Sequence, residues 1–479
     1  DETQKESFIP KIRQIEQNYQ RKKLLFLLLA TTFVLNIYAQ TFNPDEILIP
    51  DKKITLEQLP NGLTYYIRPN NYPEDEIQLL LVVKSGSMME TDDQQGLAHF
   101  FEHMAFNGTS KYPGKAITDF LEKNGTKFGY DLNAYTTYDK TVFMIKIASG
   151  KPELLDKAIE ILSQWASAVN ISESDIEKER KVIIEEWRRA QSGQNRLDNF
   201  AARKIMEGSI FENRTPIGKV EVLESFPRER LVSYYNDWYS PDRMAVIAVG
   251  NLKSDDVKKS IYKYFSPLNK KKLPRTIDMT IPLSKGTAIG VMSDPEAEEN
   301  KFQMYIKMPF HLDTTASDYK ETMVKGLFCN MLTERLDQLR REKNPPFMAA
   351  SASYSHLFES VNFYSLSVLL KENAAEEGIA RAAGELARVS QYGFTERELE
   401  LAKAEFMSFI EKLYNEKDKT HSSNLAAEYA RNFTDEEYIP GIEKEYQLYC
   451  QCIPEITLDM VNKAAYNFMS RDGRVLILT

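Results

Sequence analysis

The sequence has few cysteines and, after residue 40, no long apolar run. Three cysteines among 479 residues cannot supply a disulfide framework, and their spacing does not match a zinc-binding cluster. We therefore expect them to be small buried residues. A membrane-spanning helix needs about 20 apolar residues, so no stable span is expected once the N-terminal segment has been removed.

The chain also lacks an excess of positive charge. Lys and Arg number 61 against 70 Asp and Glu, for a net charge of −9. A nucleic-acid partner is therefore not expected, and the lysine run at 270–272 is interpreted as part of a solvated linker. The composition, 42% hydrophobic and 27% charged, is typical of a globular protein. The length is enough for two or three domains.

Residues 1–39 carry the pattern of an export signal. The basic cluster Arg21–Lys23 precedes an apolar run, Leu24–Leu35, and Ala39 offers a small residue for cleavage. This order is typical of a signal peptide, here behind a polar leader at 1–20. We expect an exported protein, in a bacterial periplasm or outside the cell. An uncleaved membrane anchor is the alternative.

Helix-like and strand-like patterns alternate through the rest of the chain, which favours an α+β fold. Segments 231–250 and 458–479 both read as a helix, a short polar turn and a strand. This internal repeat predicts two related domains, at 50–268 and 284–479, joined by a linker at 269–283. Strands are expected at 64–67, 77–83, 142–147 and 244–249, and helices include 94–106 and 174–190.

The segment His99-Phe-Phe-Glu102-His103 contains two of the five histidines. The apolar pattern around it, followed by Asn-Gly at 107–108, predicts a helix that ends there. On a helix the two histidines lie one turn apart on one face and can bind one Zn²⁺. Glu102 lies on that face and can act as general base toward a metal-bound water. The alternative is two histidines satisfied on a half-buried helix.

A catalytic zinc needs a third protein ligand, and the helix at 174–190 offers carboxylates. Glu179 and Glu186 are seven residues apart and share one helical face. Buried carboxylates need a cation or a proton, so Glu186 is the predicted third ligand and Glu179 a supporting group. Glu185, rotated by about 100°, is a weaker candidate. A solvated acidic helix is the structural alternative.

Two further features of this helix bear on the same prediction. Ser174 and Glu177 have the spacing of a capping box that opens the helix. Val182 and Ile183 lie between the two glutamates on or near their face. We therefore expect that this face is buried.

Together these motifs resemble the pitrilysin/insulinase family of H-x-x-E-H zinc peptidases, which includes the mitochondrial processing peptidases. The match is closest to exported bacterial zinc proteases, whose motif continues Met-Ala-Phe-Asn-Gly-Thr as it does here. The resemblance covers residues 56–479. It implies two homologous domains, each a mostly antiparallel sheet backed by helices, together forming half of a clamshell. The domain at 50–268 would bind one Zn²⁺ and that at 284–479 would be an inactive copy. The implied roles are metal ligands for His99, His103 and Glu186, general base for Glu102 and support for Glu179.

A second motif of this family is Asn133-Ala134-Tyr135-Thr136. In the family it opens an edge strand beside the metal, and the substrate backbone adds to that strand. The resemblance therefore implies that Asn133, Ala134 and Tyr135 bind an extended peptide. An ordinary turn before a strand is the alternative.

One family feature is incomplete. Family members use an Arg and a Tyr seven residues apart to bind substrate and stabilise the oxyanion, and here Arg340 is followed by Phe347. The resemblance then implies that this chain is an N-terminal half and that a second homologous half or subunit supplies the Arg/Tyr pair. The implied function is a zinc metalloendopeptidase that hydrolyses extended, unfolded peptides through a metal-activated water. The alternative is a catalytically incomplete fragment or peptide-binding scaffold.

Overall fold

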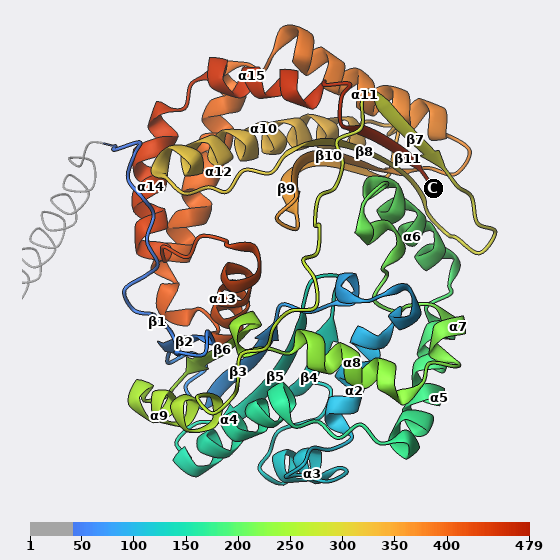
Figure 1. Cartoon of the computed structure of the whole chain (residues 1–479). Coiled ribbons are helices and arrows are strands. Elements are labelled where there is room, and N and C mark those ends of the chain that lie inside the picture. The colour runs from blue at the N-terminus through green and yellow to red at the C-terminus, as the bar shows by residue number, and fades with distance from the viewer. Residues whose placement is uncertain (1–41) are drawn as a thin grey trace, which may run out of the picture.

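The computed structural model describes residues 42–479, so the predicted leader and signal peptide lie outside the described part of the chain. The described residues form two sheets with helices packed on them, one below and one above a central region that holds further helices (Figure 1). The predicted α+β fold with two mostly antiparallel sheets is confirmed. Within residues 42–479, no helix combines the length and apolar character needed to cross a membrane.

The first sheet has the order β1-β2-β6-β3-β5-β4, and only the β2–β6 pair is parallel. All four strands expected from the sequence are present. The central strands are continuous apolar runs because both faces of the sheet are covered. Strand β4 lies at one edge, and no other strand of the described chain pairs with its outer side. The strands are β1 (Thr55–Gln58), β2 (Thr64–Pro69), β3 (Glu76–Val83), β4 (Leu132–Thr136), β5 (Thr141–Ala148) and β6 (Met244–Gly250).

The second sheet repeats this topology without a counterpart of β1. Its order is β7-β11-β8-β10-β9, and its parallel pair, β7–β11, takes the place of β2–β6. Strands β6 and β11 end the two repeated segments of the sequence, and they hold equivalent positions in the two sheets. The strands are β7 (Thr287–Val291), β8 (Asn300–Pro309), β9 (Ala349–Leu357), β10 (Val361–Leu370) and β11 (Arg474–Leu478).

Helices that follow the strands of the first sheet cover its lower face in Figure 1 and enclose the largest apolar core. Within this core Trp165 and Phe143 stack, with ring centroids 5.3 Å apart. The helices of the first half are α2 (Leu97–Phe106), α3 (Ala116–Lys123), α4 (Pro152–Ser167), α5 (Glu173–Arg189), α6 (Gly193–Ile205), α7 (Val220–Leu223), α8 (Arg228–Trp238) and α9 (Ser254–Phe265), and of these α6 packs on the second sheet instead. Short 3₁₀ turns lie at Ser87–Met89, Asp92–Gln94, Ile210–Asn213 and Pro241–Arg243.

A second core lies between the second sheet and the helices above it. Leu48, from the segment that precedes β1, is buried in this second core. Between α9 and β7 the chain forms no regular helix or strand, and the predicted linker lies in this stretch. The helices of the second half are α10 (Ala316–Arg340), α11 (Ala375–Tyr392), α12 (Glu396–Asn415), α13 (Ser422–Asp435), α14 (Ile442–Glu455) and α15 (Leu458–Phe468), with a 3₁₀ turn at Lys417–Lys419, and of these α13 packs on the first sheet instead.

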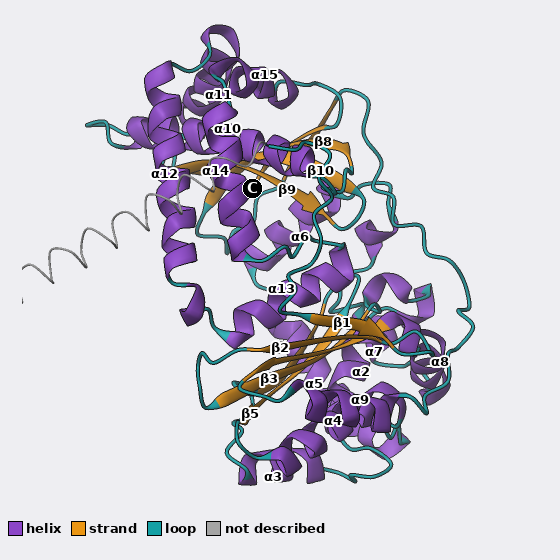
Figure 2. Cartoon of the chain, turned by 90° about the vertical axis from the view of Figure 1, so that its left-hand side faces the viewer, coloured by secondary structure: helices purple, strands orange, loops and turns teal. Residues whose placement is uncertain are grey.

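One helix from each half packs on the sheet of the other half. Helix α13 covers the upper face of the first sheet (Figure 2), where Tyr429 stacks on Tyr66 with ring centroids 5.8 Å apart. Helix α6 lies against the second sheet, where Ala201 packs with Val475 and Ile477 of β11. We refer to these two contacts as the reciprocal packing.

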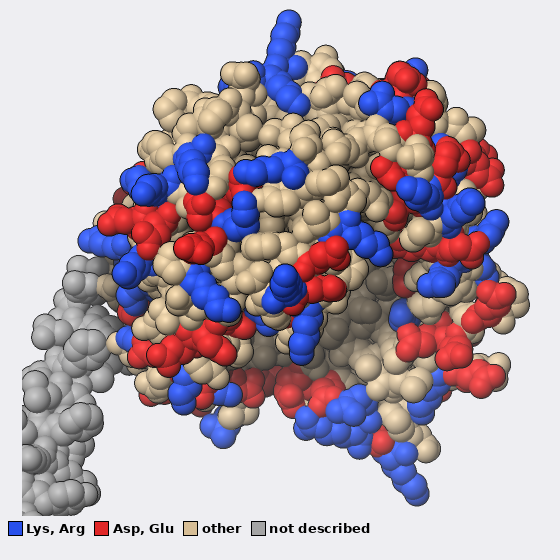
Figure 3. Space-filling view, turned by 90° about the horizontal axis from the view of Figure 1, so that it is seen from below, with Lys and Arg blue, Asp and Glu red and all other residues tan. Residues whose placement is uncertain are grey.

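The surface and the cysteines agree with the composition. On the face seen from below, Lys and Arg side chains are interspersed with Asp and Glu (Figure 3). The three cysteines are free thiols and all are buried, as expected.

Candidate metal centre

The two histidines lie on α2, and a buried carboxyl group fixes the start of this helix. Oε1 of Glu90 accepts hydrogen bonds from the backbone N–H groups of Gly96 (3.0 Å) and Ala98 (2.8 Å). Those N–H groups have no partner within the helix, so Glu90 satisfies them. Burial holds the pKa of Glu90 well above its usual range. The sequence predicted a start at residue 94, which is wrong because Gly96, with φ of 101°, separates the preceding 3₁₀ turn from α2.

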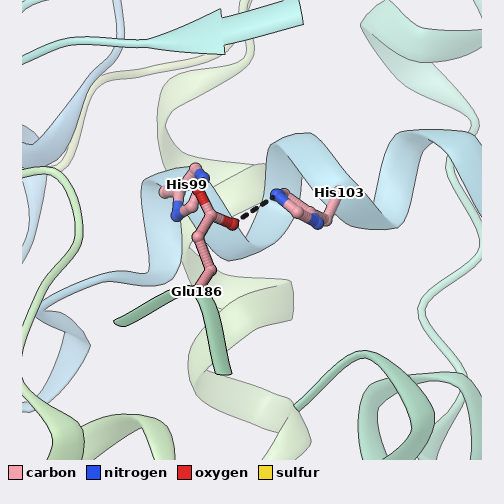
Figure 4. Close-up of side chains that lie close together, drawn as sticks. All are labelled: His99, His103 and Glu186. Atoms are coloured by element: carbon pink, nitrogen blue, oxygen red, sulfur yellow. Dashed lines mark ion pairs between the residues drawn. The ribbon is translucent and has the colours of Figure 1, made fainter. Parts of the chain in front are cut away.

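The ligand atoms of His99, His103 and Glu186 lie within 4.8 Å of one another (Figure 4). The Glu186 carboxylate reaches from α5 toward both imidazoles, 3.6 Å from His99 Nε2 and 3.5 Å from His103 Nε2. Tetrahedral zinc with bonds of about 2.0 Å places its ligands about 3.3 Å apart. The donor set and its spacing therefore fit one zinc ion.

Glu179 orients His103 from behind. Its Oε1 lies 2.9 Å from His103 Nδ1, and its Oε2 accepts a hydrogen bond from the Asn107 amide at 2.7 Å. A carboxylate at Nδ1 favours the tautomer whose Nε2 lone pair is free for a metal. Burial raises the pKa of Glu179, but the hydrogen bonds from His103 and Asn107 lower it more, and the net shift is downward.

The two imidazoles have opposite pKa shifts. Burial, followed by the charge of His103, lowers the pKa of His99 to about 3, so His99 is neutral at neutral pH. Burial also lowers the pKa of His103, but the hydrogen bond to Glu179 and the nearby carboxylates raise it more. His99 Nδ1 is buried and has no hydrogen-bond partner within residues 42–479.

Glu102 lies beside the candidate ligands His99 and His103 on α2, with only 7% of its surface exposed. Its Oε2 accepts a hydrogen bond of 2.7 Å from the Thr136 hydroxyl on β4. Burial raises the pKa of Glu102, and a carboxyl with a raised pKa suits proton transfer near neutral pH. Thr136 belongs to the sequence motif of the edge strand, but no role was predicted for it. The sequence feature that could have revealed this contact is the alternation of side chains along a strand, which places Thr136 on the same face as Ala134.

The predicted peptide-binding residues lie on the edge strand β4. Asn133 and Tyr135 are exposed, and Ala134, half-buried, pairs with Phe143 of β5. The Asn133 side chain is held locally, because its Oδ1 accepts from the Ala134 backbone N–H (2.9 Å) and its Nδ2 donates to the Gly129 carbonyl (3.2 Å). The structure therefore places this motif on an open sheet edge beside the candidate metal centre.

Two details predicted for α5 are wrong. The N-cap is Ser172, whose hydroxyl accepts from the Asp175 backbone N–H at 3.2 Å, so Ser174 already lies inside the helix. Val182 is 52% exposed and the Glu186 side chain is 46% exposed, so the predicted burial of the whole Glu179–Glu186 face is wrong. The buried side of α5 is set by Ile176 and Ile183, and Val182 is turned about 100° from that direction.

The remaining candidates lie away from the cluster. Glu185 is exposed and pairs with Arg188 on the outer side of α5. Arg340 pairs with Asp337 at the end of α10, and Phe347 is fully buried in the second core.

Comparison with known proteins relates this chain to a family of peptidases. The model for insulinase (peptidase family M16) matches residues 65–213, and the model for the peptidase M16 inactive domain matches residues 225–406. A zinc protease PQQL-like protein of Arabidopsis thaliana is 33% identical over 421 residues, which is 88% of this chain and 41% of the relative. A probable zinc protease PqqL of Haemophilus influenzae is 28% identical over 466 residues, or 96% and 50% of the two chains.

Solved structures show the same fold. The crystal structure of the first half of the periplasmic protease PqqL from Escherichia coli matches with a TM-score of 0.84 and 24% identity, covering 90% of this chain and 92% of that one. The structure of PqqL from the same organism matches over 48% of its length. This chain thus spans half or less of the length of the curated relatives named above. From the two consecutive family matches and the shared fold, we conclude that the chain belongs to the insulinase family of peptidases, family M16.

Proposed function

We propose that this chain is the metal-binding half of a zinc metalloendopeptidase that hydrolyses extended, unfolded peptides. The observation that carries the proposal is the convergence of His99, His103 and Glu186 on one point, with Glu102 beside them. The names of the relatives, which are zinc proteases, support zinc as the metal. Two histidines and one carboxylate form a catalytic zinc site when the fourth position is left open for water.

In the proposed mechanism, different side chains hold the metal, transfer the proton and orient these groups. When bound, a zinc ion would polarise the peptide carbonyl and make a water molecule acidic enough to attack it. Glu102 takes the proton of that water and returns it to the departing nitrogen. Thr136 holds the Glu102 carboxylate in place, and Glu179 holds His103 with Nε2 directed at the metal.

The edge strand β4 supplies the proposed substrate site. An extended peptide can pair with an open strand edge through main-chain hydrogen bonds, with little dependence on its sequence. A substrate carbonyl would replace Asn133 Oδ1 as the acceptor of the Ala134 N–H, and Tyr135 lies exposed beside it. A folded protein offers few free strands, so unfolded peptides are the proposed substrates.

The oxyanion donors are proposed to come from outside this chain, from a second homologous half or subunit that carries an Arg/Tyr pair. The greater length of the curated relatives and the burial of Phe347 support this. The solved neighbour from Escherichia coli is a periplasmic protease, and we propose the same location for this chain, reached through the N-terminal signal segment. A catalytically incomplete fragment or peptide-binding scaffold remains the second candidate, and the exposed β4 edge favours peptide binding in either case.

The test combines metal analysis with peptide cleavage. We expect one zinc per chain and cleavage of an unfolded peptide by this chain together with its second half. Glu102→Gln should abolish cleavage and keep the zinc, while the exposed Glu185→Gln serves as the matched control with unchanged activity. Cleavage that survives Glu102→Gln would refute the mechanism. Zinc binding and peptide binding without any cleavage in the complete protein would favour the scaffold.

A further inference from the structure

A pocket of about 450 Å³ lies directly beyond the carboxyl end of β4. Four parts of the chain form it: the β4–β5 turn at 137–140, the end of α6, the hairpin between β9 and β10, and Asp435 at the end of α13. The pocket thus joins the two halves next to the proposed substrate edge. The apolar side chains that line it are Tyr138, Ala202, Ile205, Met206, Leu357 and Phe358.

The hairpin wall of this pocket is fixed in place. Phe358 has φ of +53°, a left-handed conformation that is strained for a bulky residue and persists only when its surroundings hold it. Its ring stacks on Phe211 with centroids 4.1 Å apart and an interplanar angle of 3°, and meets Tyr138 edge-on at 5.8 Å. The strain and the stacking together indicate a preformed wall.

The charged groups at the rim bond to one another. Lys140 Nζ lies 3.2 Å from Asp435 and 3.6 Å from Asp139, and it also donates to the Thr434 hydroxyl at 2.9 Å. With these groups paired and the rest of the lining apolar except for Thr137 and His356, the pocket matches an apolar side chain better than an ionic ligand. Its volume lies in the range of about 300–1,000 Å³ that is usual for ligand sites.

The pocket continues the line of β4. Thr136 holds Glu102 through its hydroxyl, and the next residue, Thr137, already lines the pocket. A strand advances about 3.3 Å per residue, so a peptide paired with β4 reaches the pocket about two to four residues from the bond that lies beside Glu102. We propose that this pocket is a specificity subsite for one large apolar side chain, such as leucine, methionine or phenylalanine, of an extended peptide substrate.

The inference rests on the proposed function, so its test measures binding apart from cleavage. The probe is a dye-labelled peptide of serine, threonine and glutamine, made with and without one central leucine. Each peptide is titrated with this 479-residue chain in the presence of a chelator, and the Kd of the complex is measured by fluorescence anisotropy. Burying one leucine should tighten binding roughly tenfold to hundredfold.

Three variants locate this preference. Ala202→Trp fills the pocket from α6 and should bring the Kd ratio of the two peptides close to one. Phe358→Ala removes the hairpin wall and should reduce the ratio, which keeps the test valid if the tryptophan variant fails to fold. Asn195→Trp adds the same ring at an exposed position of α6 and should leave the ratio unchanged.

The outcomes separate this inference from the proposed function. A leucine preference that Ala202→Trp abolishes and Phe358→Ala reduces supports the subsite, and cleavage sites mapped by mass spectrometry should then lie at a fixed offset from the leucine. Equal binding of both peptides to the unaltered chain, or a preference that survives in Ala202→Trp and Phe358→Ala, overturns the subsite alone. Failure to bind either peptide overturns peptide recognition at β4 and the subsite with it.

Discussion

Replacement of Glu179 tests how strongly the metal centre depends on the carboxylate behind His103. A charge-assisted hydrogen bond contributes about 1.5–3 kcal/mol, and the bond from His103 Nδ1 to Glu179 measures 2.9 Å. Loss of such an orienting partner weakens metal binding by about 10- to 100-fold. In Glu179→Gln an amide oxygen can still accept from Nδ1–H, so we expect a loss near tenfold. Glu179→Ala removes the acceptor, and we expect a loss near hundredfold.

The assay is competition for zinc against a chromophoric chelator, which gives Kd for each variant. Glu185→Gln removes a carboxylate from the same helix at an exposed position away from the cluster, and its Kd should match that of the unaltered chain. Thermal unfolding of the metal-free proteins shows whether α5 remains folded. If Glu179→Ala bound zinc within twofold of the unaltered chain and remained folded, the orienting role of Glu179 would be wrong.

Two further predictions concern the support of Glu102 and the contact between the halves. Thr136→Val removes the hydroxyl that donates to Glu102 at 2.7 Å, so kcat should fall about tenfold or more, with zinc content and KM nearly unchanged. Thr136→Ser keeps a hydroxyl and should restore most of the rate. A kcat in the valine variant equal to that of the unaltered chain would contradict the supporting role of Thr136. Tyr429→Ala removes a ring that is 2% exposed between α13 and the first sheet, so the free energy of unfolding should fall by about 3–5 kcal/mol. Denaturant titration should still show one transition, and a separate, unaltered transition for the first half would contradict the coupling.

Much of the fold followed from local patterns. The apolar runs that became β3, β5 and β6 were readable because a covered strand needs apolar side chains on both faces. The candidate metal centre could be predicted from the sequence because a helix fixes which residues share a face, as for His99 and His103. The role proposed for the edge strand β4 came from the resemblance to the family.

Other features depend on contacts that are distant in sequence. The sequence did not reveal that Thr136 would meet Glu102, because that contact requires β4 to pack over α2. It assigned the wrong exposure to Val182, because spacing within a helix does not show which side faces the core. The pocket wall formed by Phe358 depends on where a hairpin of the second sheet meets Phe211, 147 residues earlier in the numbering. Local propensity carries no information on such pairings.

The reciprocal packing of α6 and α13 determines where this protein can bend. Separating the two halves at the linker would leave each sheet without a helix that covers it, and would expose Tyr66 and Ile247 on one half and Val475 on the other. The two halves therefore form a single rigid unit rather than two domains joined by a hinge. In the two-part peptidase that we propose, the opening that admits a peptide then occurs between this unit and the second homologous half. The β4 edge and its pocket keep their shape during that opening.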